Sequence, residues 1–484
     1  MTTTTQKATV LALGLLLVPT LGHAQSTEDL IKRLDRLEQE NQSLRRDLTA
    51  LQAQQSKAGE TKASTKAQEA DAGVIMINSP LSYTLLDPTT AGKSKPLALL
   101  AAKQDGSLKP GGVVLGGGLT AIADYQSTNF SSDFGYLMRQ PGASHIGKSV
   151  SEAAIHSAQL HVTTAVNPWL TAYVELLYDP QQSFGAGTIT ALSRNQIQLR
   201  RGYALIGDLN RSPVYGMIGK FDTPFGQTDT VNPFSLSTDG HTFAGLAYGA
   251  LIGYSKNGLN LTAEAVEGGS AFRGLNTPVD GTNVPSRLNN YVLDANYMAN
   301  LGGRNRTLLA GASYEKGSSY CQSFPITHFG ACSKANPAYA VYSTLNWDQF
   351  TLKGQYVSTV NPMPGTHNPN APLNIYKASR ISSYDVGLKY RTNAFDKPLH
   401  LSADFSTLIA GPNGSPWQHQ DQWVAGIASF PSPNVKLFSE VIFVDGYLPL
   451  QFLTGGTPGE DPGDTESSTD KRSKVLMTGI TLAF

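Results

Sequence analysis

The stretch Tyr384-Asp-Val-Gly-Leu-Lys-Tyr-Arg391 alternates apolar residues with small or charged ones at every step. Successive side chains of an extended strand point to opposite faces, so the apolar residues share one face and the charged residues the other. The stretch Leu399-His-Leu-Ser-Ala-Asp-Phe-Ser406 repeats this pattern. A charge that faces lipid at mid-membrane costs about 2–4 kcal/mol, so such sorting is typical of a wall between lipid and a wet lumen.

The same alternation recurs along the chain after residue 110. It predicts strands of about ten residues, close to the roughly 9–11 residues with which a tilted strand crosses a membrane. Aromatic residues near the expected strand ends, such as Trp347 and Trp423, fit the girdles of membrane proteins. The sixteen expected strands are 112–124, 153–165, 168–178, 193–207, 213–221, 246–255, 258–268, 288–299, 305–315, 337–347, 349–359, 380–391, 397–406, 421–430, 433–444 and 473–484.

The connections between these strands differ in length according to parity. Those after even-numbered strands are tight turns, such as Lys256-Asn-Gly258, whereas those after odd-numbered strands are long. Long loops on one side and short turns on the other are typical of outer-membrane barrels. An even strand count places both barrel termini on the short-turn, periplasmic side. The long connections are 125–152, 179–192, 222–245, 269–287, 316–336, 360–379, 407–420 and 445–472.

The composition agrees with a barrel and argues against other classes. Charged residues make up 15% of the 484 residues, compared with roughly 25% in soluble domains. The mean hydropathy of −0.20 is too low for a bundle of membrane helices. A formal net charge of zero gives no support to nucleic-acid binding.

The N-terminus carries the one long apolar run. Lys7 precedes the run from Ala8 to Val18, and Gly22-His-Ala24 follows it. This order predicts a signal peptide over residues 1–24 with cleavage after Ala24. A retained anchor helix is the alternative, although the run is too short to span a bilayer.

Residues 25–54 have the leucine spacing of a periplasmic coiled coil. Ser26 and Asp29 fit a capping box at its start. The asparagine in the seam sets the register by pairing with its counterpart in another strand, so we expect a homo-oligomer, with a trimer as the working guess. A single amphipathic surface helix is the alternative. The seam residues are Leu30, Leu34, Leu37, Asn41, Leu44, Leu48 and Leu51.

Residues 55–110 are predicted to be a linker and a barrel-proximal segment, and residues 111–484 to be the barrel. The part from 55 to 72 is polar and aperiodic. The part from 73 to 110 contains short apolar pieces that are compatible with packing near or within the barrel mouth. It is too short for the plug domain of an energised receptor, which argues against coupling to an inner-membrane energy source.

Both cysteines, Cys321 and Cys332, lie eleven positions apart in one long connection. An even pair close together in an exported chain predicts a loop disulfide. Two unpaired thiols are the alternative.

The passage Tyr215-Gly-Met-Ile-Gly-Lys-Phe-Asp-Thr-Pro-Phe-Gly226 resembles the Gly-Lys-Phe-x-x-Pro-Phe-Gly pattern of phosphate-selective porins. It also resembles the legiobactin-type siderophore porins, as do the runs Ala172–Asp179 and Gly245–Gly268. That family combines a signal peptide, a coiled coil and a barrel. The resemblance implies a trimeric or monomeric outer-membrane channel that passes small solutes, including a metal–siderophore complex. The absence of an evident ladder of lumen arginines argues against anion selectivity.

The C-terminal alternation of Ile480, Leu482 and Phe484 resembles the signal that the barrel-assembly machinery recognises. Together with the signal peptide and the loop parity, it indicates an outer-membrane location, with the coiled coil in the periplasm. Outer-membrane lipid and the assembly machinery are therefore expected partners.

The third long connection, 222–245, is predicted to fold inward and narrow the pore, because charges held close together in a lumen select solutes. A solvated outer loop is the alternative. Lys220 reaches the lumen if its strand turns Gly216 and Ile218 inward, and otherwise lies at the membrane interface. The expected pore-lining residues are Lys220, Asp222, Asp229, Asp239, His241, Glu175, Glu264, Lys353, Asp385, Lys389 and Asp404.

Adjacent Arg200 and Arg201 fit the strand 193–207 poorly, since one of them must point away from the lumen unless a bulge intervenes. The acidic run Glu460-Asp-Pro-Gly-Asp464 is either a site for a hard cation or, more simply, part of a solvated loop.

The sequence carries no catalytic, zinc or phosphate-binding motif, so no enzyme activity, cofactor or metal is expected. The expected fold is a sixteen-stranded antiparallel outer-membrane barrel with an N-terminal coiled coil, and the expected function is a solute channel. Two other functions are a closed structural barrel tethered through the coiled coil and a barrel enzyme.

Overall fold

The structure is a computed structural model that describes residues 75–87, 89, 92–129, 148–179, 196–268, 287–303, 305–324, 332, 334–448 and 467–484. The predicted signal peptide, the coiled coil, residues 55–74 and the acidic run 460–464 lie outside these residues. None of the helices that it describes is both long and apolar enough to cross a membrane.

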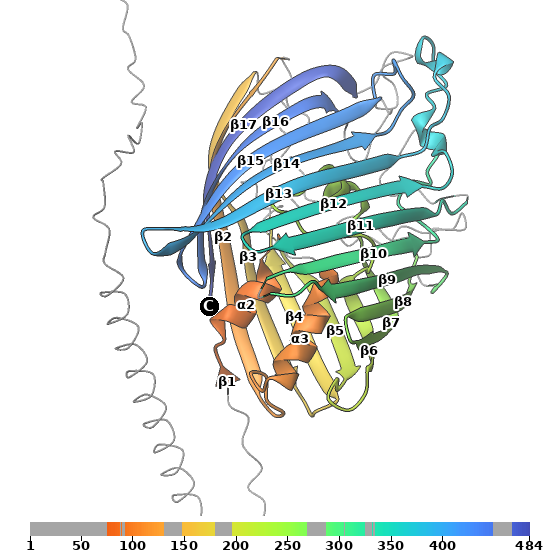
Figure 1. Ribbon diagram of the computed structural model, residues 1–484. Coiled ribbons are helices and arrows are strands. Elements are labelled where there is room, and N and C mark those ends of the chain that lie inside the picture. The colour runs from red at the N-terminus through yellow and green to blue at the C-terminus, as the bar shows by residue number, and fades with distance from the viewer. Residues whose placement is uncertain are drawn as a thin grey trace, which may run out of the picture. The chain divides into compact units, whose positions relative to one another are not determined.

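Sixteen antiparallel strands form a closed barrel, as the alternation predicted (Figure 1). Each strand pairs with its neighbours in sequence, and the last strand pairs with the first to close the ring. The strands are β2 (Val113–Thr128), β3 (Ser149–Ala165), β4 (Leu170–Tyr178), β5 (Ile197–Gly207), β6 (Val214–Asp222), β7 (Leu246–Lys256), β8 (Leu259–Val266), β9 (Asn290–Asn300), β10 (Thr307–Glu315), β11 (Ala338–Trp347), β12 (Phe350–Thr359), β13 (Ser382–Ala394), β14 (Lys397–Ile409), β15 (His419–Ser432), β16 (Val435–Tyr447) and β17 (Ser468–Ala483).

The tight turns follow the local sequence. Between β7 and β8, Asn257 and Gly258 both have positive φ, 52° and 84°. Two such residues in succession make the turn whose twist matches that of paired strands, and asparagine followed by glycine adopts it most readily. The backbone conformation of these two residues therefore explains why this connection is short.

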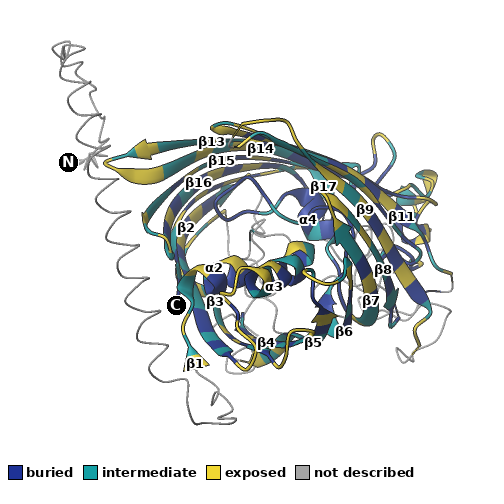
Figure 2. Ribbon diagram, turned by 60° about the horizontal axis from the view of Figure 1, so that its bottom comes forward, coloured by how far each residue is buried: buried dark blue, intermediate teal, exposed yellow. Residues whose placement is uncertain are grey.

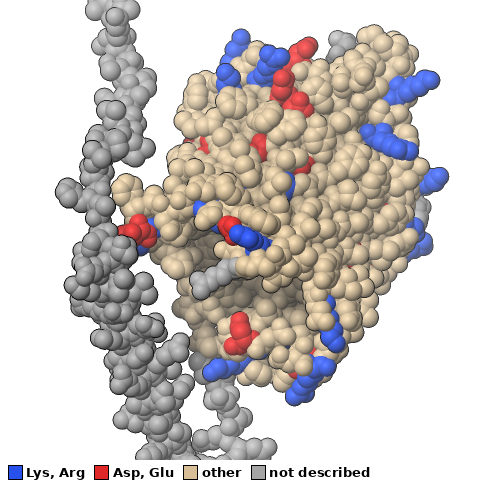
Figure 3. Space-filling view, in the orientation of Figure 1, with Lys and Arg blue, Asp and Glu red and all other residues tan. Residues whose placement is uncertain are grey.

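The outward faces are apolar and the inward faces are polar or small over most of the barrel. On β13, Val386 and Leu388 are exposed, whereas Asp385 and Gly387, which alternate with them, are buried against the lumen contents. Figure 3 shows the outer surface of the facing wall, where a broad area with few charged groups lies between those near the rims. A closed barrel with such an apolar belt satisfies every backbone group within lipid.

We expect Leu388→Arg to destabilise the barrel by about 2–4 kcal/mol, because the residue lies in the middle of β13 on the outward face. Urea-induced unfolding in lipid vesicles measures the change. The matched control is Asn296→Arg, which places the same charge on the cavity-lining face of β9. Equal destabilisation by both substitutions would contradict the assignment of faces.

Strand β5, in which the adjacent Arg200 and Arg201 conflicted with the alternating pattern, contains a β-bulge. Glu175 of β4 pairs with Arg201 of β5, but the next residue, Leu176, pairs with Leu199. Arg200 is therefore the extra residue, and the bulge resolves the conflict that two adjacent arginines posed.

The N-terminal segment 75–110 lies, over most of its described residues, inside the barrel rather than before it (Figures 1 and 2). It begins with β1 (Ile75–Met76), which pairs in parallel with β2. It continues through α2 (Ser79–Leu86), the 3-10 turn η1 (Gly92–Ser94) and α3 (Lys95–Gln104). We call residues 75–110 the lumen segment.

The connection between β6 and β7, residues 223–245, also folds into the barrel, and we call it loop 3. It carries α4 (Thr238–Phe243), which packs against β12, β13 and β14 on the far wall. The remaining short helical turns are η4 (Pro364–Thr366) and η5 (Leu373–Ile375), both in the connection between β12 and β13.

Candidate functional site: the lumen between the lumen segment and loop 3

The lumen segment is held in place by apolar packing. Leu85, Leu99, Leu100 and Leu108 are at most 1% exposed and form one core cluster with wall residues that include Tyr173. Burying one leucine contributes about 1.5–3 kcal/mol, so these four together contribute on the order of 6–12 kcal/mol. A contribution of that size makes the segment a fixed part of the barrel under resting conditions.

The wall beneath the lumen segment is correspondingly apolar on its inner face. Leu205, Met217 and Phe221 all point inward and are buried in this cluster. The alternation rule predicts polar residues at such positions, but the segment shields them from water. The apolar inner surface is therefore a consequence of the covered lumen.

Two glycines create the space that the segment occupies. A Cβ at Gly116 of β2 would lie 1.9 Å from Oγ of Ser82 in α2, and a Cβ at Gly92 would lie 2.2 Å from Cγ of Asp222. Any other residue at either position would force the facing side chain or the segment itself to shift. The close approach of segment and wall thus depends on these glycines.

Ion pairs fix the segment to opposite sides of the lumen. Asp87 accepts from Nζ of Lys436 on β16, with both carboxylate oxygens 3.3 Å away. Lys93 donates to Oδ1 of Asp294 on β9 at 3.1 Å and to the Tyr342 hydroxyl at 2.7 Å. The segment therefore bridges β16 and β9, in addition to its apolar contacts.

The Asp87 carboxylate is stabilised in its ionised form. Burial on its own raises the pKa of this group, but the Lys436 ammonium and the hydrogen bonds from Thr89 outweigh burial, so the pKa lies below its ordinary value. A lowered folded-state pKa means that the pair contributes fully above the ordinary pKa of about 4 and is lost as the pH falls through the lowered value.

We expect acidification from neutral pH to below about pH 4 to loosen the lumen segment and to raise the ion conductance. Part of this rise depends on Asp87, so Asp87→Asn should show a smaller ratio of acid to neutral conductance than the unmodified protein. Asp105→Asn, an exposed aspartate of the same segment, is the control. Identical ratios for Asp87→Asn and the unmodified protein would contradict this role for the pair.

A second charged network lies beneath α3. Arg201 donates to Oε1 of Glu175 at 2.8 Å and to Oδ2 of Asp222 at 2.5 Å, so one guanidinium joins two carboxylates. Lys95, at the start of α3, is 3% exposed. Burial, with the nearby Arg201 charge, lowers the pKa of the Lys95 ammonium to about 8. The lumen segment thus adds a fourth charge to this group.

Loop 3 is bonded along its length to the opposite wall. Glu440 of β16 accepts from the backbone N–H groups of Phe234 (2.7 Å) and Ser235 (3.0 Å). Gln355 of β12 accepts from the backbone N–H of Gln227 at 2.5 Å and donates to Asp239. These contacts keep the loop across the lumen instead of over the outer rim.

Lys353 of β12 is the charge centre beneath loop 3. It is 2% exposed and donates to the backbone carbonyl of Asp229. Its Nζ lies 3.6 Å from the Asp229 carboxylate and 3.5 Å from that of Asp385. An ammonium shared between loop and wall is a strong tether at low dielectric.

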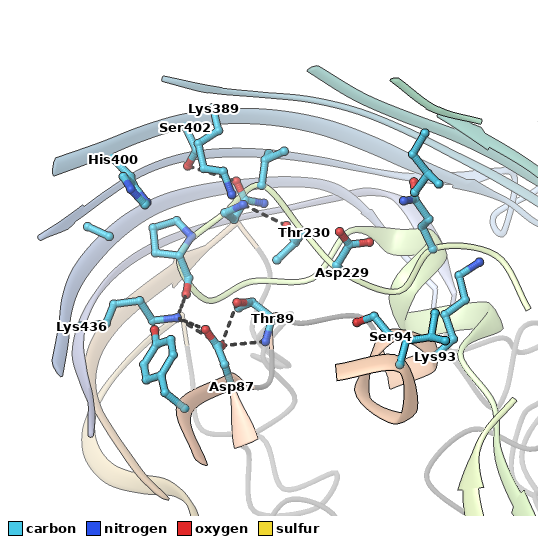
Figure 4. A pocket seen from close by; sticks show the side chains of 18 of the residues that line it. Asp87, Thr89, Lys93, Ser94, Asp229, Thr230, Lys389, His400, Ser402 and Lys436 are labelled. Carbon is cyan, nitrogen blue, oxygen red and sulfur yellow. Dashed lines mark hydrogen bonds and ion pairs between the residues drawn. The ribbon is translucent and has the colours of Figure 1, made fainter. Parts of the chain in front are cut away.

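A cavity of about 540 Å³ remains between the lumen segment and loop 3 (Figure 4). The lumen segment, loop 3 and wall strands β8–β10 and β13–β16 all contribute to its lining. Its polar and charged lining residues are Tyr83, Asp87, Thr89, Lys93, Ser94, Gln227, Asp229, Thr230, Asn232, Asn260, Asn296, Lys389, His400, Ser402 and Lys436.

The expected pore residues do not all lie in this cavity. Asp229 and Lys389 line it, whereas Glu175 and Asp222 lie beneath α3 with Arg201. The other inward-facing members of the expected set are Glu264, Lys353, Asp385 and Asp404, which are buried in the wall, and loop 3 carries Asp239 and His241 on α4. Glu264 and Asp404 have buried carboxylate oxygens without a hydrogen-bond partner among the described residues.

Lys220 is a correction, because it lies on the outward face of β6. Its Nζ donates to the backbone carbonyl of Leu199 at 3.0 Å and lies 5.7 Å from the exposed ring of Tyr248. Tyr215 and Met217 point inward instead, so Ile218 and Lys220 point outward. The alternative position at the membrane interface fits this residue.

The sequence did not single out Arg201, Asp294, Lys436, Asp87 or Lys93 as site residues. Asp294 and Lys436 fall on the inward phase of their strands, so a systematic count of inward charges would have found them. Asp87 and Lys93 lie in a segment without strand periodicity, and no local signal marks them.

The remaining predicted elements lie at the barrel ends. Cys321 and Cys332 form a disulfide in the connection between β10 and β11. The ring of Phe484 lies against Gly117 of β2, where a Cβ would come within 2.3 Å of it. Among the described residues, no group of three or more acidic, histidine or cysteine side chains is arranged to hold a metal ion.

Comparison with known proteins shows only distant similarity. No family model matches the sequence. A UPF0422 protein from Coxiella burnetii is 27% identical over 86 residues, which are 18% of this chain and 17% of that protein. The chain therefore matches less than a fifth of the length of this relative.

Several solved porin structures resemble the barrel. The anion-selective porin from Comamonas acidovorans has a TM-score of 0.47 at 13% identity and covers 77% of this chain and 99% of its own. Pseudomonas putida OprB has a TM-score of 0.45 at 8% identity, with 76% and 94% covered. Salmonella typhi OmpF in complex with daunomycin has a TM-score of 0.44 at 12% identity, with 77% and 97% covered. The fold assignment rests on the strand pairing of this chain itself.

Proposed function

We propose that this chain forms a channel for small solutes through the bacterial outer membrane, and that solutes pass through the cavity between the lumen segment and loop 3. The observation that carries the proposal is the cavity itself, which is lined by polar and charged side chains from several wall strands and enclosed by a barrel with an apolar outer belt. An inward-folded loop that brings charges together is a physical basis for solute selection.

Planar-bilayer recording tests this function directly. The purified, folded protein should give stepwise currents of uniform size. The rival function is a closed structural barrel tethered to the cell wall or a partner, and the extent of buried packing in the lumen favours it. A silent barrel that retains heat-modifiable gel mobility would reject the channel.

Uptake of a metal–siderophore complex is the finer form of the proposal. It is supported by the likeness of residues 172–179, 215–226 and 245–268 to the legiobactin-type porins. Growth on ferric chelates as the sole iron source, with and without the protein, tests it. If cells with and without the protein grew equally well on every chelate, siderophore uptake would be rejected, and the channel would have another specificity.

We further propose that residues 25–54 associate as a periplasmic coiled coil, with a trimer as the working stoichiometry, and that Ile480, Leu482 and Phe484 direct barrel assembly. Analytical ultracentrifugation of the unmodified protein and of a variant with Leu37 and Leu44 replaced by aspartate tests the first proposal. The variant should sediment as a monomer.

A further inference from the structure

Most charged side chains that face the cavity are already neutralised by a partner. Lys436 is paired with Asp87, and Lys93 with Asp294. Asp229 is close to Lys353, which also reaches Asp385. These pairs leave little net charge on their side of the cavity.

Two cations on β13 differ from this pattern. Lys389 and Arg391 lie on its inward face, and within the described residues neither has an ion pair with a carboxylate. Arg391 donates to Oδ1 of Asn346 at 3.4 Å, a long hydrogen bond to a neutral acceptor. In register, Lys389 lies opposite Ser402 of β14, and Arg391 lies opposite His400. Among the residues that line the cavity, Lys389 therefore contributes a positive charge without an ion pair.

Neutral hydrogen-bonding groups adjoin the Lys389 ammonium. Lys389, Ser402 and His400 lie along one side of the cavity, with Thr230 of loop 3 facing them (Figure 4). The Ser402 hydroxyl donates to Oδ1 of Asn232 over 3.5 Å, which is long for a hydrogen bond. Because this bond is weak, the hydroxyl can rotate and donate to a bound ligand instead. An anion at this position would accept hydrogen bonds from an ammonium and a hydroxyl.

Apolar surface continues from the cationic wall. Phe430 packs on the His400 ring, with centroids 4.6 Å apart. Pro233 of loop 3, Leu97 of α3 and Met298 of β9 also line the cavity. A bound molecule would therefore meet both the Lys389 ammonium and hydrocarbon.

We propose that this cavity binds a small organic acid, with its carboxylate at Lys389 and Ser402 and its apolar part against Phe430 and Pro233. This inference deepens the proposed function, since it names the substrate class of the same cavity. The other charged groups that face the cavity, Asp87, Asp229, Lys93 and Lys436, are held in the pairs above. The site takes an anion because Lys389, the charged lining residue without an ion pair, is positive, and an organic anion because hydrocarbon also lines the cavity.

Titration calorimetry of the purified protein in detergent micelles, with benzoate as the probe, tests this site. Benzamide has the same shape without the charge and should bind more weakly. Because a charge-assisted hydrogen bond is worth about 1.5–3 kcal/mol, Lys389→Gln should weaken benzoate binding by about tenfold or more. Lys389→Arg, which keeps the charge, should retain binding, and heat-modifiable gel mobility shows that each variant is folded.

Lys397→Gln is the matched control, because Lys397 is an exposed lysine at the start of β14 outside the cavity lining. It should leave benzoate binding unchanged. Equal benzoate affinity in Lys389→Gln and the unmodified protein overturns the site, as does the absence of benzoate binding. Inorganic phosphate that binds as tightly as benzoate overturns the role of the apolar surface.

Calorimetry detects binding whether or not the barrel conducts, so failure of the organic-acid site can be distinguished from failure of the channel. Benzoate binding that is lost in Lys389→Gln, together with silent bilayers, supports the site and rejects the channel. Stepwise currents without any benzoate binding support the channel and reject the site.

Discussion

Replacement of both Leu85 and Leu99 by aspartate is expected to raise the single-channel conductance severalfold. Both side chains are 0% exposed in the cluster that holds the lumen segment. An unpaired buried carboxylate costs several kcal/mol, and two of them remove much of the estimated 6–12 kcal/mol of apolar stabilisation. The segment should leave the wall and unblock the part of the lumen that it fills, and bilayer recording measures the result.

Ile75 and Ile77 provide the matched control for this variant. They belong to the same segment but are 71% and 68% exposed, so their replacement by aspartate buries no charge. The conductance of this control variant should equal that of the unmodified protein. If the Leu85 and Leu99 variant folds, by heat-modifiable gel mobility, and conducts no more than this control, the lumen segment does not obstruct the channel.

Arg201→Met is expected to destabilise the barrel strongly. It leaves Glu175 and Asp222 facing each other without the guanidinium that joins them. Loss of one partner of a buried ion pair typically costs about 3–5 kcal/mol. Lys95 lies near the same carboxylates and offsets part of that cost. The midpoint of urea unfolding in lipid vesicles should fall accordingly.

Arg211→Met is the control for the network. Arg211 also pairs with an aspartate, Asp208, at 3.4 Å, but its side chain is 66% exposed. Exposed pairs contribute about 0–1 kcal/mol, so this variant should unfold close to the unmodified protein. Restoration of stability by adding Glu175→Gln and Asp222→Asn to Arg201→Met would show that the stranded carboxylates cause the loss. Equal unfolding midpoints for Arg201→Met and Arg211→Met would contradict a structural role for the network.

The sequence was sufficient for the barrel because the constraint acts locally. Each residue of the β13 stretch faces either lipid or lumen, and a wrong choice costs several kcal/mol at that position alone. The turn at Asn257 and Gly258 is likewise encoded by two adjacent residues. The number, order and approximate ends of the strands could therefore be predicted without knowledge of distant contacts.

The contents of the lumen could not be predicted in the same way. Met217 and Phe221 can point inward because leucines more than a hundred residues earlier in the sequence shield them from water. The local sequence pattern of β6 contains no sign of this long-range contact. The same uncertainty on β6 left the direction of Lys220 undecided. Arg200 could be predicted in part. The sequence showed that two adjacent arginines conflict with the alternation, but the pairing of β4 with β5 was needed to show that Arg200 is the bulged residue.

The central claim is that one wall, formed by single alternating strands, separates hydrocarbon from an aqueous lumen. Spin labels placed one at a time at Val386, Leu388 and Tyr390 and at Lys389 and Arg391, in vesicles, test it most directly. The first three should be accessible to oxygen dissolved in lipid, and the last two to a water-soluble nickel chelate, with a period of two. Equal accessibility of all five positions to the nickel chelate would contradict the barrel, and with it the proposed channel.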